Sequence, residues 1–169
     1  MTTFPYFNTF DAASIRGQYL RQALEHSVSR LTSDGESLGG GRLLQVSGAR
    51  LVYNLTREVG SRLVSAEVRC DDCDGDRLEA LEDDKVYNIV TLNYLLNGGA
   101  GYTMLEENTE DRVTGGLNRE VIREVMEVSS PVNARVEGRI TIIKAGTDED
   151  KNVSGANPIA GWVSSRTGS

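Results

Sequence analysis

The stretch Tyr94-Leu-Leu-Asn-Gly-Gly-Ala-Gly-Tyr102 has the residue types of a ligand-binding loop. It places two aromatic rings around three glycines, and glycine lets the backbone approach a ligand closely. The sequence also fits an ordinary turn at Asn97-Gly98-Gly99 between two exposed tyrosines, and the local pattern does not separate these interpretations. A phosphate-binding loop is excluded, because no Gly-Lys-Ser/Thr follows Gly101.

A predicted strand over residues 85–92 leads into this loop. Its β-branched and aromatic residues are typical of a buried strand, so the glycines fall where the strand ends. Binding sites often form at such ends. Similar patterns predict strands over 12–16, 50–55, 62–68 and 136–143, of which the second and third form an antiparallel hairpin that turns at Gly60.

Two helices are predicted to accompany the strands. The first covers residues 18–31, where apolar side chains recur at helical spacing and share one face: Leu20, Leu24, Val28 and Leu31. His26 lies in this helix, and we expect a structural hydrogen-bonding role for it, because a lone histidine does not build a metal site. The second helix begins near Asn118, which is expected to cap it, and it carries an apolar stripe of Val121, Val125 and Val128.

The composition indicates one compact domain. The chain has 169 residues, of which 38% are hydrophobic and 25% charged, which suits one sizeable core and is short for two. Its formal charge of −7 argues against nucleic acid or an anionic membrane surface as the main partner, because both require clustered positive charge. No segment approaches the roughly 18 apolar residues of a membrane helix, and the start lacks signal-peptide features, so we expect a soluble chain that is an excised or mature fragment.

Cys70-Asp-Asp-Cys73 is the only cysteine pair of the chain. Redox catalysis is disfavoured, because the neighbouring aspartates oppose thiolate formation. The acidic run resembles a calcium loop, but aligning Gly75 with the central glycine of such a loop places Cys70 and Leu81 at positions that require acids. A structural disulfide, which implies an oxidising compartment, is therefore favoured over calcium binding.

The sequence divides into a domain over residues 1–143 and a tail over residues 144–169. The tail is polar and rich in Gly, Ser, Asn and Asp, so we expect it to be loosely held. Asn54 and Asn152 begin N-glycosylation sequons, which carry weight only in a secreted protein.

A series of short motifs then occurs in a recognisable order: Asn8-Thr-Phe-Asp11, Ala23-Leu-Glu-His-Ser-Val28, Leu44-Gln-Val-Ser-Gly48, Val52-Tyr-Asn-Leu55, Cys70-Asp-Asp-Cys73, Asn97-Gly-Gly-Ala-Gly-Tyr102 and Val136-Glu-Gly-Arg-Ile140. This series resembles the C-terminal domain of the 5′-nucleotidase family. The family includes animal ecto-5′-nucleotidases and secreted salivary apyrases of blood-feeding arthropods. The resemblance covers about residues 4–143.

The resemblance implies an α+β fold with four α/β/β/α layers that holds the nucleoside part of a nucleotide. In the family, a separate N-terminal metallophosphoesterase domain carries two divalent, zinc-like metal ions and the hydrolytic machinery, and domain rotation brings the two domains together. Those metal-binding motifs are absent from these 169 residues, so we expect no metal or other cofactor on this chain and no hydrolysis by it alone. The paired cysteines of the family form a short disulfide, which suits Cys70 and Cys73.

The family clamps the base between two aromatic rings, which correspond to Tyr6 and Tyr94 here. Its glycine loop, Asn-Gly-Gly-Asp-Gly, corresponds to the loop that begins with Asn97, Gly98 and Gly99, and its aspartate accepts hydrogen bonds from the ribose hydroxyls. This chain has Ala100 at that position, which removes a charged acceptor.

Three interpretations follow from the resemblance. The favoured one is the nucleotide-recognition domain of an extracellular 5′-nucleotidase or apyrase, secreted or at the cell surface, which binds adenine nucleosides weakly. The second is a naturally short secreted protein that captures adenine nucleotides or binds a host protein, an interpretation that Ala100 keeps open. The third is a structural or interaction module without a ligand.

Overall fold

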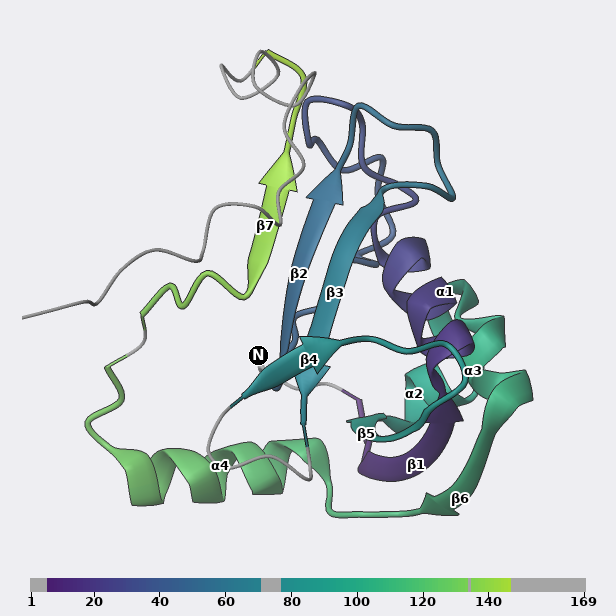
Figure 1. Ribbon diagram of the computed structural model, residues 1–169. Helices are drawn as coiled ribbons and strands as arrows, with labels where there is room; N and C mark the ends of the chain where they lie inside the picture. The colour runs from purple at the N-terminus through teal and green to yellow at the C-terminus, as the bar shows by residue number, and fades with distance from the viewer. Residues whose placement is uncertain (1–5, 71–76, 134, 147–169) are drawn as a thin grey trace, which may run out of the picture.

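The computed structural model describes residues 6–70, 77–133 and 135–146. Within these ranges the chain forms two β-sheets accompanied by helices (Figure 1). The predicted α+β fold is therefore confirmed. The predicted tail, 144–169, lies almost entirely outside the described residues, so its boundary with the domain stays a prediction. Among the described helices, none combines the length and the apolar character needed to cross a bilayer.

The first sheet is antiparallel and has the strand order β5-β1-β6. β1 (Phe10–Arg16) lies at its centre and pairs along its whole length with β5 (Val86–Leu92), from Phe10 opposite Leu92 to Arg16 opposite Val86. Both strands lie close to their predicted ranges. β6 (Thr109–Val113) pairs with the other side of β1, and no sequence pattern predicts it, because its residues are mostly polar and exposed.

The second sheet has the order β4-β3-β2-β7. β2 (Ala49–Asn54) and β3 (Leu63–Arg69) form the predicted antiparallel hairpin, and Gly60 lies in its turn with a φ of 99°. β4 (Leu78–Ala80) pairs with β3, and β7 (Ile140–Ile143) pairs in parallel with β2. The strand predicted over 136–143 is thus shorter than expected, since Gly138, at a φ of 66°, lies outside extended geometry.

α1 (Gly17–Ser27) links the two sheets, because it contributes to both hydrophobic clusters of the described residues. Leu24 packs with Leu51 and Tyr53 of β2, while Ala23 packs with Ile15 of β1. Burial raises the pKa of Tyr53 to about 12, so its hydroxyl stays protonated and donates to the carbonyl oxygen of Leu24 at 3.1 Å. Each large apolar side chain buried in this way contributes about 1.5–3 kcal/mol.

α1 ends at Ser27, although the apolar spacing predicts a helix to Leu31. The buried side chain of Arg62 explains the early end. Its Nη1 atom donates to the carbonyl oxygens of Val28, at 2.8 Å, and Leu31, at 2.7 Å. In a longer helix, amide hydrogens of the next turn would be donated to those carbonyl oxygens. The guanidinium of Arg62 takes the place of these missing donors.

One carboxylate on α1 holds the turn of the β2–β3 hairpin. Glu25 Oε1 accepts the amide hydrogens of Gly60, at 3.0 Å, and Arg62, at 2.9 Å. Its Oε2 accepts the amide hydrogen of Leu63 at 2.6 Å. Hydrogen bonds to an ionised acceptor are about twice as strong as neutral ones, so this residue fixes the hairpin on the helix.

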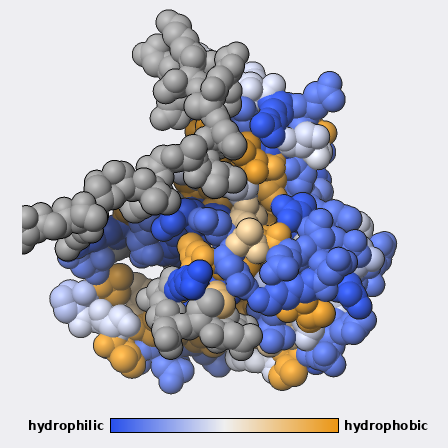
Figure 2. Space-filling model, viewed as in Figure 1, coloured by the Kyte–Doolittle hydropathy of each residue, from blue (hydrophilic) through white to orange (hydrophobic). Residues whose placement is uncertain are grey.

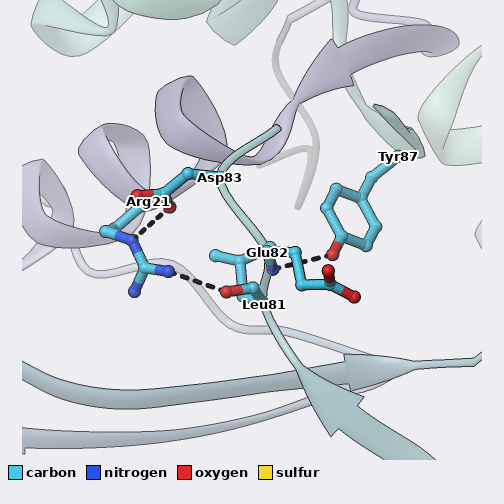
Figure 3. A network of polar contacts seen from close by, with 5 residues as sticks. All are labelled: Arg21, Leu81, Glu82, Asp83 and Tyr87. Carbon is cyan, nitrogen blue, oxygen red and sulfur yellow. Dashed lines mark hydrogen bonds and ion pairs between the residues drawn. The ribbon is translucent and has the colours of Figure 1, made fainter. Parts of the chain in front are cut away.

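The N-terminal half of α1 is held by the segment between β4 and β5 (Figure 3). Arg21 Nε donates to Asp83 Oδ1 at 2.7 Å, and its Nη2 donates to the carbonyl oxygen of Leu81 at 2.8 Å. A Cβ atom at Gly17 would overlap the carbonyl oxygen of Glu82. Only glycine therefore permits this close approach.

α4 (Asn118–Ser129) confirms the second predicted helix with two corrections. Asn118 is the first helical residue rather than the cap, which is Leu117, and its side chain accepts the amide hydrogen of Arg119 at 2.7 Å. The apolar stripe faces solvent in part, since Val125 is 57% exposed and Val128 is 83% exposed. Figure 2 shows apolar side chains at the surface at lower left, where Figure 1 places α4.

Glu25→Ala is expected to lower the free energy of unfolding by about 3 kcal/mol, because the hairpin amides lose an ionised acceptor. Glu25→Gln keeps one acceptor oxygen and should cost about half as much. Urea unfolding of the purified chain measures both values. Glu58→Ala removes an exposed carboxylate from the same turn and should change the free energy by less than about 0.5 kcal/mol. Equal losses for Glu25→Ala and Glu58→Ala would contradict the role of Glu25.

Candidate functional site

The pairing of β1 with β5 brings the two tyrosines of the predicted clamp to one end of a sheet. Asn93, which precedes Tyr94, donates its amide hydrogen to the carbonyl oxygen of Thr9 at 3.0 Å. Asn93 Oδ1 accepts the amide hydrogen of Thr9 at 3.3 Å. Tyr6 lies three residues before Thr9 in the chain, and both rings are accessible, with exposed fractions of 72% for Tyr6 and 51% for Tyr94. The segments that carry the two rings are therefore neighbours.

The segment that carries Tyr6 is also anchored to the start of α4. The carbonyl oxygen of Asn8 accepts the amide hydrogen of Asn118 at 2.9 Å. The guanidinium of Arg119 lies 5.0 Å from the centre of the Phe7 ring, within the range of a cation–π contact. No sequence pattern indicated that α4 meets this segment, because the two lie far apart in the chain.

The glycine loop consists of short helical turns, a structure that neither interpretation of the sequence specified. Tyr94 lies in α2 (Asn93–Leu96), which is followed by a turn of 3-10 helix, η1 (Gly99–Gly101), and by α3 (Thr103–Asn108). Gly98 has a left-handed backbone, with a φ of 75°, one residue beyond Asn97, which caps the C-terminus of α2. Glycine adopts this conformation without steric cost, and so the chain reverses at this point.

Each glycine of the loop lies against a side chain that a Cβ atom would meet: Gly98 faces the carboxylate of Glu106, Gly99 faces the ring of Tyr94, and Gly101 faces the ring of His26. A Cβ at Gly101 would lie 3.3 Å from the His26 ring. The glycines thus allow three side chains to approach the backbone of one loop. This close approach is the property that the sequence predicts, but the partners are protein side chains in this structure.

Both backbone groups of Ala100 are held by side chains. Its amide hydrogen is donated to Tyr94 Oη at 2.9 Å, and its carbonyl oxygen accepts from His26 Nε2 at 3.1 Å. Ala100 has a φ of 55°, a left-handed conformation that is uncommon for residues other than glycine. The predicted structural hydrogen-bonding role of His26 is therefore confirmed, and its acceptor is the candidate site itself.

The buried ring of Tyr102 packs against His26 and supports its contact with Ala100. The two rings meet edge to face, with 4.7 Å between their centres. Burial raises the pKa of Tyr102 well above its usual value, so the hydroxyl stays protonated and donates to the carbonyl oxygen of Arg42 at 2.6 Å. Of the two tyrosines that the sequence places around the loop, Tyr94 is accessible to a ligand and Tyr102 is a core residue.

Arg112 is a residue of the site that sequence reasoning missed. Its Nη1 donates to Asn97 Oδ1 at 3.4 Å, and its Nη2 donates to the carbonyl oxygens of Leu105, at 3.1 Å, and Glu106, at 2.7 Å. It therefore caps α3 and orients the amide of Asn97. No local signal could have found this role, because it depends on where α3 and β6 place their ends.

A cavity of about 360 Å³ lies beside α1 and β5, with apolar walls that include Leu20, Leu24, Leu44, Ile89 and Leu105. None of the predicted nucleoside-binding residues lines this cavity. The cavity is therefore not formed by the residues of the predicted clamp.

The remaining predicted residues are only partly covered by the described ranges. Cys70 is buried and is not a free thiol, while Cys73 and Asn152 lie outside the described residues. Asn54 ends β2, and its Oδ1 accepts the amide hydrogen of Thr56 at 2.9 Å and the Thr56 hydroxyl at 2.7 Å. The described residues contain no group of three or more His, Cys, Asp or Glu that fits a metal ion. The disulfide and the glycosylation stay predictions.

Comparison with known proteins identifies the family. The family model of the 5′-nucleotidase C-terminal domain matches residues 1–107. An apyrase of Tabanus yao is 39% identical over 147 residues, which are 85% of this chain and 26% of the apyrase. A snake venom 5′-nucleotidase of Crotalus adamanteus is 40% identical over 143 residues, which are 85% of this chain and 23% of that protein.

Structural comparison agrees with the sequence matches. The crystal structure of a 5′-nucleotidase precursor from Thermus thermophilus has a TM-score of 0.73 and 33% identity, over 83% of this chain and 26% of that one. The chain belongs to the 5′-nucleotidase C-terminal domain family. It spans about a quarter of the length of these relatives.

Tyr94→Phe is expected to speed hydrogen exchange at the Ala100 amide about fivefold, because the amide loses a hydrogen bond worth about 1 kcal/mol. Exchange followed by NMR on the folded chain measures the effect. Tyr87→Phe is the matched control, since the Tyr87 hydroxyl accepts the amide hydrogen of Glu82 at 2.9 Å, as Figure 3 shows. It should speed exchange at Glu82 and leave Ala100 unchanged. An unchanged Ala100 amide in Tyr94→Phe would show that the hydroxyl does not hold the loop.

Proposed function

We propose that the chain is the nucleoside-recognition domain of a secreted or cell-surface 5′-nucleotidase or apyrase. An adenine ring is held between Tyr6 and Tyr94, and the loop from Asn97 to Ala100 lies against the sugar. The observation that supports this most directly is the β1–β5 pairing, which makes the segments of two accessible tyrosines neighbours. Each base–aromatic stack contributes about 1–3 kcal/mol, so the domain alone binds weakly.

Phosphate hydrolysis belongs, in this proposal, to a separate N-terminal metallophosphoesterase domain with two zinc-like metal ions. The support is the length of the relatives, of which this chain covers about a quarter. The residues of this chain have the task of binding and orienting the nucleoside while the other domain acts on the phosphate. No step of the hydrolysis is assigned to the described residues.

Tyr94→Ala is expected to abolish adenosine binding, which should lie in the millimolar range for the unchanged chain, because one of the two stacking rings is lost. Ala100→Asp should tighten binding about ten- to a hundredfold by adding a charge-assisted acceptor, and Ala100→Asn, without the charge, should tighten it less. Calorimetry or ligand-observed NMR measures the affinities, with the exposed Val128→Ala as a control that leaves them unchanged. The same preparations should release no phosphate from AMP with added divalent metal. Unchanged affinity in both Tyr94→Ala and Ala100→Asp would overturn the clamp.

An extracellular location is proposed from the relatives and from the cysteines. Several relatives are snake venom 5′-nucleotidases by name, and Cys70 is buried and is not a free thiol.

Cys70 and Cys73 are expected to form an intrachain disulfide, because they lie close in sequence and acidic neighbours disfavour free thiolate. A thiol count on the unfolded, unreduced protein should find none, and reduction should reveal two. Two titratable thiols before reduction would exclude the disulfide.

A second candidate function is a stand-alone secreted protein that captures adenine nucleotides or binds a host protein. Ala100 favours it, since a methyl group offers a ribose no acceptor. Loss of Tyr94 without any effect on nucleoside binding would make host-protein binding the better proposal.

A further inference from the structure

Arginines from three strands meet at one end of the four-stranded sheet. β2 and β7 run in parallel and β3 runs against them, as Figure 1 shows, so the starts of β2 and β7 lie at the same end as the close of β3. Arg50 is the second residue of β2, Arg69 is the last residue of β3, and Arg139 directly precedes β7. The fold therefore collects side chains that are scattered in the sequence.

These three arginines line one cavity of about 380 Å³. The neighbour of Arg50 in β2, Leu51, is fully buried in the core. Successive side chains of a strand point to opposite faces, so Arg50 points away from the core, and the residue is exposed. The cavity thus lies on the outer face of the sheet.

A second cavity, of about 310 Å³, adjoins the first, since Glu137 and Arg139 line both. It adds a fourth arginine, Arg135. Together the two cavities form the arginine groove, which is defined by Arg50, Arg69, Arg135 and Arg139. Among the described residues no aromatic side chain lines it, and polar side chains or bare backbone separate the arginines at four positions: Gln45, Ser47, Gly48 and Gly138.

The guanidinium groups of the groove keep donors for a ligand, because each group has five N–H donors. Arg139 Nε donates to Glu137 Oε2 at 2.9 Å, and its Nη1 donates to the carbonyl oxygen of Val46 at 2.6 Å. These bonds fix the group and leave its Nη2 available. Arg50 Nη1 lies 3.8 Å from Glu67 Oε2, which is longer than a hydrogen bond.

The groove is positive although the chain as a whole is acidic. Arg135 has neither a hydrogen bond nor an ion pair within the described ranges, whereas Arg69 has an interaction of its own and is set aside. The three other arginines then face two carboxylates, those of Glu67 and Glu137. Charges more than about 8 Å apart are largely screened at physiological ionic strength, so a ligand here meets this cluster rather than the formal charge of −7.

The planar fork of arginine matches the oxygens of a sulfate group and holds them with paired hydrogen bonds. Several sulfates on one chain gain from arginines in adjoining cavities, because each binding event raises the effective concentration of the next. Single-stranded nucleic acid fits less well, since it relies on aromatic stacking. We infer that the arginine groove binds a sulfated polysaccharide, an inference that rests on the extracellular location in the proposed function and not on the nucleoside site.

The test measures the affinity of a heparin octasaccharide for the full chain by calorimetry at several salt concentrations. Arg50→Gln and Arg135→Gln should each weaken binding about fivefold and together about twenty-five-fold, because each removes charge-assisted hydrogen bonds to a different sulfate. Binding should also weaken steadily with added salt, as counterions of the polyanion compete. Arg57→Gln changes an exposed arginine in the turn at the opposite end of the β2–β3 hairpin, and this matched control should leave the affinity unchanged.

Four outcomes would overturn the inference. No binding of the octasaccharide to the unchanged chain removes it outright, and equal weakening by Arg57→Gln shows attraction to arginines in general. Equally tight binding of a desulfated octasaccharide excludes sulfate recognition, and equally tight binding of polyglutamate shows a general anion site.

Adenosine affinity, measured on the same variants, should not change. If adenosine binds and the octasaccharide does not, the inference falls and the nucleoside site stands. The opposite result removes the nucleoside site and supports the groove.

Discussion

The last turns of α1 are the part of the structure on which the β2–β3 hairpin and the glycine loop both depend. The adjacent residues Glu25 and His26 bind in different directions, one to the amides of the β2–β3 hairpin and the other to the carbonyl of Ala100. The guanidinium of Arg62, which belongs to the hairpin, donates hydrogen bonds to the carbonyl oxygens that follow the end of the helix. Removing the side chain of Glu25, His26 or Arg62 would leave its backbone partners without that hydrogen bond. A change in this turn therefore affects the hairpin and the glycine loop.

This arrangement makes the candidate site a rigid loop beside accessible rings. The backbone of Ala100 is held from two sides before any ligand arrives, and His26 is itself supported by the buried Tyr102. A ligand therefore spends less binding energy on ordering the loop, which is the general advantage of preorganisation. The rings of Tyr6 and Tyr94 differ from the loop, because both are more than half exposed, and under the proposed function they would gain contacts when a nucleoside binds.

The sequence predicted the elements that have a strong hydrophobic period and missed those that depend on distant partners. β1, β5, the hairpin and α1 follow from apolar spacing, while the choice of Tyr6, Tyr94 and the loop as site residues rests on the family resemblance and stays a prediction. β6 carries mostly polar, exposed residues, and α3 is only six residues long, so neither leaves a periodic signal. The contact of His26 with Ala100 spans 74 residues of sequence, and the end of α1 depends on Arg62, so local pattern could predict neither.

The parallel pairing of β7 with β2 has a consequence for how the chain folds as it is made. Leu51 of β2 pairs with Ile140 of β7, so most of the domain sequence lies between these two neighbouring strands. During synthesis β3 can pair with one edge of β2 early, while the other edge stays unpaired until residues 140–143 leave the ribosome. An unpaired strand edge is a template for association with other chains. The nascent domain is thus exposed to aggregation for much of its translation, and the closing step is the addition of its last described strand.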